Sequence, residues 1–138
     1  MKHTIAQKIT ILIVWIDLVI NYTLGLFLLF LPYAFDRMIG SLPVLSPFLY
    51  QVIGGGLIVF AGWQSYMVSK KLLFTIQYLW TAITLAILPV IILTTALLFG
   101  DFSIKTTWMI IIWLGDLYMV LLTAWYFKAL SVFSGIKK

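Results

Sequence analysis

Four apolar runs, each long enough to cross a lipid bilayer, fill most of this chain of 138 residues. A membrane-spanning helix needs about 20 mostly apolar residues, and we expect such helices at about 9–31, 48–68, 72–98 and 107–127. Only 9% of the residues are charged, against roughly 25% in soluble domains. This composition excludes a soluble globular fold, a disordered chain and a nucleic-acid-binding domain. The sequence therefore predicts an all-α, four-transmembrane-helix bundle, in which residues 1–138 form a single integral membrane domain.

The distribution of basic residues predicts how this bundle lies in the membrane. Two basic residues, Arg37 and Lys105, fall on one side, each near an acid. The other seven fall on the side of the two termini: Lys2, Lys8, Lys70, Lys71, Lys128, Lys137 and Lys138. Cytoplasmic loops carry an excess of Lys and Arg. We therefore expect a multi-pass protein of an inner or plasma membrane, with an even number of spans and with both N- and C-termini in the cytoplasm.

The four acidic residues separate into two kinds. Asp36 and Asp101 are expected in loops, where solvation accounts for them. Asp17 and Asp116 fall inside spans, where an acid costs about 2.5–3.5 kcal/mol at the helix centre, so neither should face lipid. No Lys, Arg or His lies within any span. Each aspartate is therefore protonated, shares a proton with the other, or faces water or a bound cation. Whether the two meet stays open, because one sequence does not give the helix order.

Polar and small residues follow the helical repeat in the first span. Asp17, Asn21 and Gly25 have the spacing i, i+4, i+8 and line one face. With Asp116, Asp17 and Asn21 make up the candidate intramembrane polar site, which is either a structural hydrogen-bonded contact or a binding and proton-handling site. Glycines let helix backbones approach closely in membranes. The candidate helix-packing residues are Gly25, Gly54, Gly55 and Gly62.

The third span carries Gln77, Thr81 and Thr84 on one face, which we expect to make packing contacts. Pro89 predicts a bend, because proline removes a backbone donor from the helix.

Residues for enzymatic chemistry are scarce. The sequence has no Gly-rich phosphate loop followed by Lys, no H-E-x-x-H and no G-x-S-x-G. It has no Cys, no Glu and a single His, His3, so a metal site or a nucleophile–base pair has almost nothing to be built from. We expect no enzyme activity, no catalytic residue, no resident metal and no cofactor.

A longer pattern suggests a resemblance. Polar residues in the first helix are followed by a proline, then by a Pro-x-x-Tyr-x-x-x-Gly entry to the second helix and a basic turn. The residues are Asp17, Asn21, Gly25, Leu29 and Pro32, then Gly40, then Pro47, Tyr50 and Gly54, then Lys70 and Lys71. This order resembles small bacterial four-helix integral membrane proteins, DoxX-like in size and layout. For DoxX-like proteins proper, the resemblance implies a four-helix bundle that serves as a membrane subunit in quinone-linked redox chemistry. Only the bundle carries over, because no residue here corresponds to a redox motif.

Asp17 is also similar to the essential first-helix acid of the small multidrug transporters.

Two functional hypotheses follow. The first is a non-enzymatic membrane module that self-associates or packs with another membrane subunit, because buried polar groups occur without catalytic companions. The alternative is a proton- or cation-coupled small-molecule transporter, with Asp17 and Asp116 as its coupling carboxylates. The expected partners are the lipid bilayer and either a second copy or another membrane protein, without nucleic acid.

Overall fold

A computed structural model describes residues 3–40, 46–99 and 104–134 of the chain. These residues form five helices: α1 (His3–Phe30), α2 (Pro32–Ile39), α3 (Pro47–Ser69), α4 (Ile76–Phe99) and α5 (Thr106–Ser134). The expected all-α fold is confirmed. The predictions made for Asp101, Lys2, Lys137 and Lys138 concern residues outside the described ranges.

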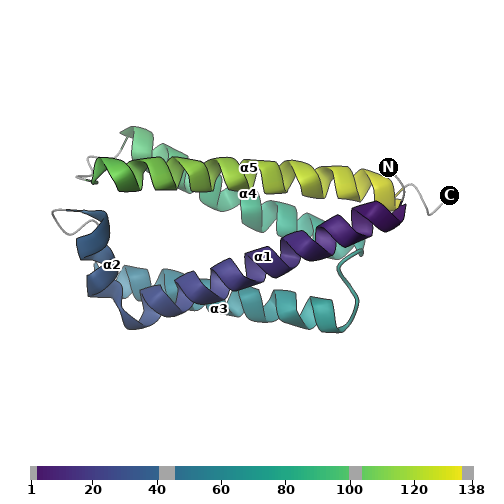
Figure 1. The fold of residues 1–138 in the computed structure, drawn as a ribbon, viewed down its shortest axis with the longest axis horizontal. Coiled ribbons are helices and arrows are strands. Elements are labelled where there is room, and N and C mark those ends of the chain that lie inside the picture. The colour runs from purple at the N-terminus through teal and green to yellow at the C-terminus, as the bar shows by residue number, and fades with distance from the viewer. Residues whose placement is uncertain (1–2, 41–45, 100–103, 135–138) are drawn as a thin grey trace.

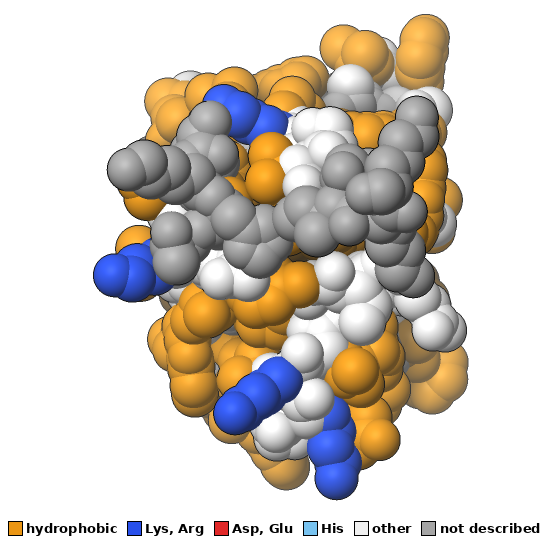
Figure 2. Space-filling model, turned by 90° about the vertical axis from the view of Figure 1, so that its right-hand side faces the viewer, with side chains coloured by type: hydrophobic (Ala, Val, Ile, Leu, Met, Phe, Trp, Pro, Cys, Tyr) orange, Lys and Arg blue, Asp and Glu red, His pale blue; other side chains and the backbone are white. Residues whose placement is uncertain are grey.

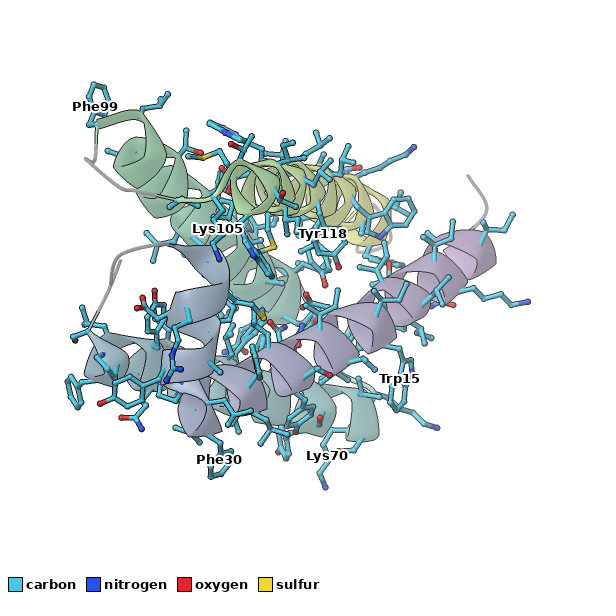
Figure 3. The ribbon with its side chains drawn as sticks, turned by 60° about the vertical axis from the view of Figure 1, so that its left-hand side comes forward. Trp15, Phe30, Lys70, Phe99, Lys105 and Tyr118 are labelled. Atoms are coloured by element: carbon cyan, nitrogen blue, oxygen red, sulfur yellow. The ribbon has the colours of Figure 1, made fainter. Side chains whose placement is uncertain are left out.

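Three of the described helices are long and apolar enough to cross a membrane, namely Ile5–Phe30, Pro47–Ser69 and Thr106–Phe133. A shorter apolar helix, Ile76–Ile91, belongs to α4. Many large apolar side chains point outwards, including Trp15, Phe30 and Phe99 (Figure 3). In water this surface would be costly, whereas in a bilayer it faces hydrocarbon. These features are those of a membrane protein.

α4, which corresponds to the third predicted span at about 72–98, begins later than predicted, at Ile76. Lys71 adopts a left-handed backbone conformation with φ 56°. The Leu72 amide donates to the Met67 carbonyl at 2.9 Å and the Lys71 amide to that of Val68 at 3.0 Å. This pattern is a Schellman motif, which closes a helix. The residues up to Thr75 therefore belong to the turn, and Thr75 Oγ1 caps α4 by accepting from the Tyr78 amide at 3.2 Å.

The segment after the first span is also different from the prediction. The sequence predicts no helix between the spans at about 9–31 and 48–68, but Pro32 begins the eight-residue helix α2. Proline suits this first position, where its missing N–H is not needed. Asp36, expected in a loop, lies in α2 and accepts a hydrogen bond from Tyr50 Oη of α3 at 2.8 Å. This contact ties α2 to α3, so a helix forms where the sequence suggested only a solvated connection.

The long helices form two pairs, in which α1 packs on α3 and α4 packs on α5 (Figure 1). α1 runs obliquely, close to α5 at the end that carries both termini and away from it at the other end. Near the termini, Trp125 Nε1 of α5 donates to Thr10 Oγ1 of α1 at 3.1 Å. At the opposite end, the Lys105 amide donates to the Ile39 carbonyl at 3.0 Å, and Lys105 Nζ donates to the Arg37 carbonyl at 3.1 Å. Hydrogen bonds thus join the two helix pairs at each end of the molecule.

The end with the termini is basic. Figure 2 views the molecule from this end, where lysine or arginine side chains stand out and no acidic side chain is coloured. The turn between α3 and α4 lies at this end as well (Figure 1). The described lysines of this end are Lys8, Lys70, Lys71 and Lys128.

Candidate functional site

Asp17 of α1 and Gln64 of α3 form a hydrogen bond inside the bundle. Gln64 Nε2 donates to Asp17 Oδ2 at 2.7 Å, and the two residues are only 5% and 1% exposed. Gln64 was not among the predicted site residues. The signal that could have found it is its position ten residues after Gly54, since both residues lie on the buried face of α3 with Tyr50 and Ala61. A polar amide on the face that packs against α1 can reach an acid there.

Asn21 lies one turn after Asp17, as the sequence predicted, and it is 8% exposed. Its Nδ2 is buried without a hydrogen-bond partner among the described residues, and so is Gln64 Oε1. The Asn21 amide nevertheless lies close enough to interact with the Asp17 carboxyl. Buried polar atoms in folded proteins are nearly always hydrogen-bonded to protein or to ordered water, so these two atoms distinguish this part of the bundle from an apolar core.

Three tyrosines add further polar atoms to this region. The hydroxyls of Tyr78, Tyr118 and Tyr126 are buried, and none has a hydrogen-bond partner in the described part of the chain. The rings of Tyr78 and Tyr126 meet edge to face with centroids 6.2 Å apart, and Trp63 stacks on Tyr78 at 5.2 Å. Tyr118 extends from the side of α5 that faces α1 (Figure 3). The predictions missed these tyrosines, although a phenol within an apolar span needs a polar partner.

A cavity of about 70 Å³ lies among these groups, with walls from all four long helices. Its polar wall residues are Asp17, Asn21, Gln64 and Tyr126. A water molecule needs roughly 10–15 Å³ of such space, so the cavity can hold a few waters or one small ion. Pockets that bind drug-sized ligands have volumes of roughly 300–1,000 Å³, so this cavity is too small for one. None of the described wall residues is basic.

Asp116 is placed elsewhere. Thr94 Oγ1 of α4 donates to Asp116 Oδ2 of α5 at 2.6 Å, and Asp116 is buried between these helices but is not a wall residue of the cavity. The structure therefore gives the two aspartates different partners in different helix pairs. The alternative in which they share one proton requires a direct carboxyl–carboxyl contact, and this arrangement does not provide it.

The predicted glycines fall into two groups. A Cβ atom on Gly54 would lie 2.6 Å from the Gly25 carbonyl oxygen, and one on Gly25 would lie 2.9 Å from that of Gly54. These two glycines let α1 and α3 approach closely. A Cβ on Gly62 would reach only Tyr22 Oη at 4.0 Å, and one on Gly55 would meet nothing within 4 Å. Within the described residues Gly55 thus has no close neighbour from another helix, and its packing role stays a prediction.

The polar face predicted on the third span does not reach the cavity. Thr81 Oγ1 donates to the Gln77 carbonyl at 2.8 Å and Thr84 Oγ1 to that of Trp80 at 3.0 Å, so both threonines bond within α4. Pro89, by contrast, is a wall residue of the cavity.

The chain matches no protein-family model, no curated protein and no solved structure.

Proposed function

We propose that the chain is a four-span membrane protein with cytoplasmic termini that acts, without enzymatic activity, as a proton- or cation-coupled small-molecule transporter. One observation carries the proposal: the buried Asp17 carboxyl lines a cavity between four helices, beside amide and hydroxyl groups that have no hydrogen-bond partner in the described part of the chain. The resemblance to DoxX-like proteins stays a prediction.

The arrangement of the ends supports four spans. Both termini and the turn after Ser69 lie at one end, while α2 lies at the other (Figure 1). α4 has 24 residues, which at 1.5 Å per residue gives about 36 Å, longer than the hydrocarbon core of roughly 30 Å. The basic side chains at the end with the termini support a cytoplasmic location for it.

The energetics favour an occupied site over a purely structural contact. A structural role is complete when Gln64 bonds Asp17, yet within the described residues five buried polar atoms of this region make no hydrogen bond. Each such atom costs roughly 1–3 kcal/mol when desolvated and unbonded. Ionisable residues inside membranes commonly mark ion or substrate pathways. Because separate hydrogen bonds join the two helix pairs at each end, the pairs can separate at one end while the other end stays closed, as alternating access requires.

The test is flux into proteoliposomes that contain a pH-sensitive dye or, in parallel, are supplied with ²²Na⁺. We expect the wild-type protein to conduct at least one of these ions, and Asp17→Asn to remove the flux. The matched control is Asp116→Asn, because this second intramembrane acid lies outside the cavity walls. Flux that is equal in wild type, Asp17→Asn and protein-free liposomes would contradict the proposal.

A second candidate, self-association or packing with another membrane subunit, is favoured by a separate observation. Gly55 and Gly56 of α3 have open space around them, which leaves small residues available to a neighbouring helix. Cross-linking in bilayers should then give a dimer that Gly56→Leu removes and Gly115→Leu, another open position, retains. A monomer at all protein-to-lipid ratios would contradict this candidate.

A further inference from the structure

We infer that the cavity binds one monovalent metal cation of the Na⁺ class, held by oxygen atoms of Asp17, Gln64 and Tyr126. The inference rests on the proposed function, because it names the ion that the proposed transporter would couple to. It begins from the chemistry of the cavity walls, which combine a carboxyl, an amide and a phenol with apolar side chains.

The orientation of the Gln64 amide points to a cation. Its nitrogen end donates to Asp17 Oδ2, which leaves its oxygen end, Oε1, buried without a donor in the described residues. A fixed carbonyl oxygen beside a carboxylate is a suitable pair of ligands for a hard cation, which prefers oxygen. The Tyr126 hydroxyl is also buried and has no hydrogen-bond partner within the described ranges, so it can turn its hydrogen away and offer a lone pair.

The backbone of α4 lacks one regular helix hydrogen bond between two wall residues of the cavity. Leu85 and Pro89 are both wall residues, and they are four positions apart in α4. In a regular α-helix, the amide of residue 89 would bond the carbonyl of residue 85, but proline has no N–H. The Leu85 carbonyl therefore lacks its regular helix donor at the position where α4 passes the cavity. This carbonyl is a further acceptor for an ion or for a water bound to it.

The charge of the walls sets the charge of the ion. Asp17 is the acidic wall residue, and no basic residue is among the described walls. A monovalent cation makes a neutral pair with one carboxylate, whereas a divalent cation would leave one uncompensated positive charge within the membrane. Uncompensated buried charge is strongly disfavoured. The volume of about 70 Å³ suits one small ion with few waters.

The experiment measures the thermal unfolding of the full-length protein in nanodiscs during titration with NaCl, with choline chloride holding the ionic strength constant. A ligand that binds only the folded state raises its stability in a saturable manner. We expect saturable stabilisation by Na⁺ in wild type and Asp116→Asn, and none in Asp17→Asn. Gln64→Leu, which removes one ligand, should weaken the apparent Na⁺ affinity roughly tenfold, the effect of about 1.4 kcal/mol. Should Asp17→Asn fail to fold, ²³Na NMR line broadening of wild type against Gln64→Leu gives the same comparison.

The outcomes separate this inference from the proposed transport. Saturable Na⁺ stabilisation without flux supports the ion site and removes the transporter. Proton flux that needs Asp17 but shows no response to Na⁺ overturns the ion site and keeps a proton-coupled transporter. An equal Na⁺ response in Asp17→Asn, or stronger saturable stabilisation by CaCl₂, also overturns the inference.

Discussion

Gly25 and Gly54 bring the backbones of α1 and α3 so close that a Cβ on Gly54 would lie 2.6 Å from the Gly25 carbonyl oxygen. The helices run in opposite directions (Figure 1). From this contact, Asp17 lies eight residues and Gln64 ten residues toward the end that carries the termini. At a rise of about 1.5 Å per residue these stretches are about 12 Å and about 15 Å long, so the two side chains lie at similar heights along the bundle. The glycine contact therefore sets the separation at which Gln64 can donate to Asp17.

Alanine at Gly54 should be strongly destabilising. Its new Cβ would meet backbone atoms, the Gly25 oxygen at 2.6 Å and the Leu29 nitrogen at 2.8 Å, so the helices must separate. Overpacking of this kind costs roughly 1–3 kcal/mol. Gly56→Ala is the matched control, because nothing lies within 4 Å of its Cβ position and alanine favours helix. Unfolding in a graded detergent mixture gives the free energies, and equal values for the two variants would contradict the role of Gly54.

A double-mutant cycle should show that Asp17 and Gln64 are coupled. Gln64→Leu in the wild-type background removes the donor of a buried 2.7 Å hydrogen bond, whereas in the Asp17→Leu background no carboxyl is left to lose it. We expect a coupling energy of about 0.6–1.7 kcal/mol, the range known for hydrogen bonds between membrane helices. The measurement is the free energy of unfolding of all four proteins. Additive effects would show that the bond contributes no stability.

The contact between Thr94 and Asp116 should contribute to the pairing of α4 with α5. Thr94→Val keeps the shape of the side chain but removes the hydroxyl that donates at 2.6 Å, and a loss of about 0.6–1.7 kcal/mol is expected. Thr95→Val, at a neighbouring exposed position, is the control and should cost less. Thermal unfolding in bilayers compares the two variants, and the same loss in both would exclude a specific contribution from the Asp116 bond.

Glycine at position 71 should stabilise the protein. Lys71 has φ 56°, a left-handed conformation that costs a residue with a Cβ roughly 1–2 kcal/mol, so Lys71→Gly should raise the free energy of unfolding by about 1 kcal/mol. Lys70→Gly removes the same charge at φ −88° and should give no gain. A gain from both variants would instead indicate relief of charge repulsion.

Locking one end of the molecule should stop transport. Gly40 and Ile104 face each other in an isolated antiparallel bridge between the two helix pairs, and opposite residues in such a bridge have Cα atoms about 4.5–5.5 Å apart, suitable for a disulfide. The natural chain has no cysteine, so the pair Gly40→Cys and Ile104→Cys can be tested cleanly. Oxidation should block flux and a reductant should restore it, while each single variant should remain active. Full flux in the oxidised protein would show that this end does not have to open.

The apolar runs predict the long helices well, since hydrophobic length alone requires them. The burial of Asp17 and Asn21 follows equally from their position within a span. α2 was missed because its formation depends on tertiary contacts, such as that between Tyr50 and Asp36, which local sequence does not encode. Gln64 was missed for a related reason. Its role requires knowing which face of α3 meets α1, and helix order is a property of the packed bundle.

The cavity is also a seam, because α1 and α3 supply one side of it and α4 and α5 the other. Neither helix pair encloses it alone. The affinity for an occupant of the seam therefore depends on the spacing between the pairs. By thermodynamic reciprocity, an occupant that binds more tightly at one spacing stabilises that spacing. Occupancy of the cavity and the spacing between the two helix pairs are therefore linked in one equilibrium. A few small groups at the centre of a 138-residue chain can in this way shift the relative position of the two pairs.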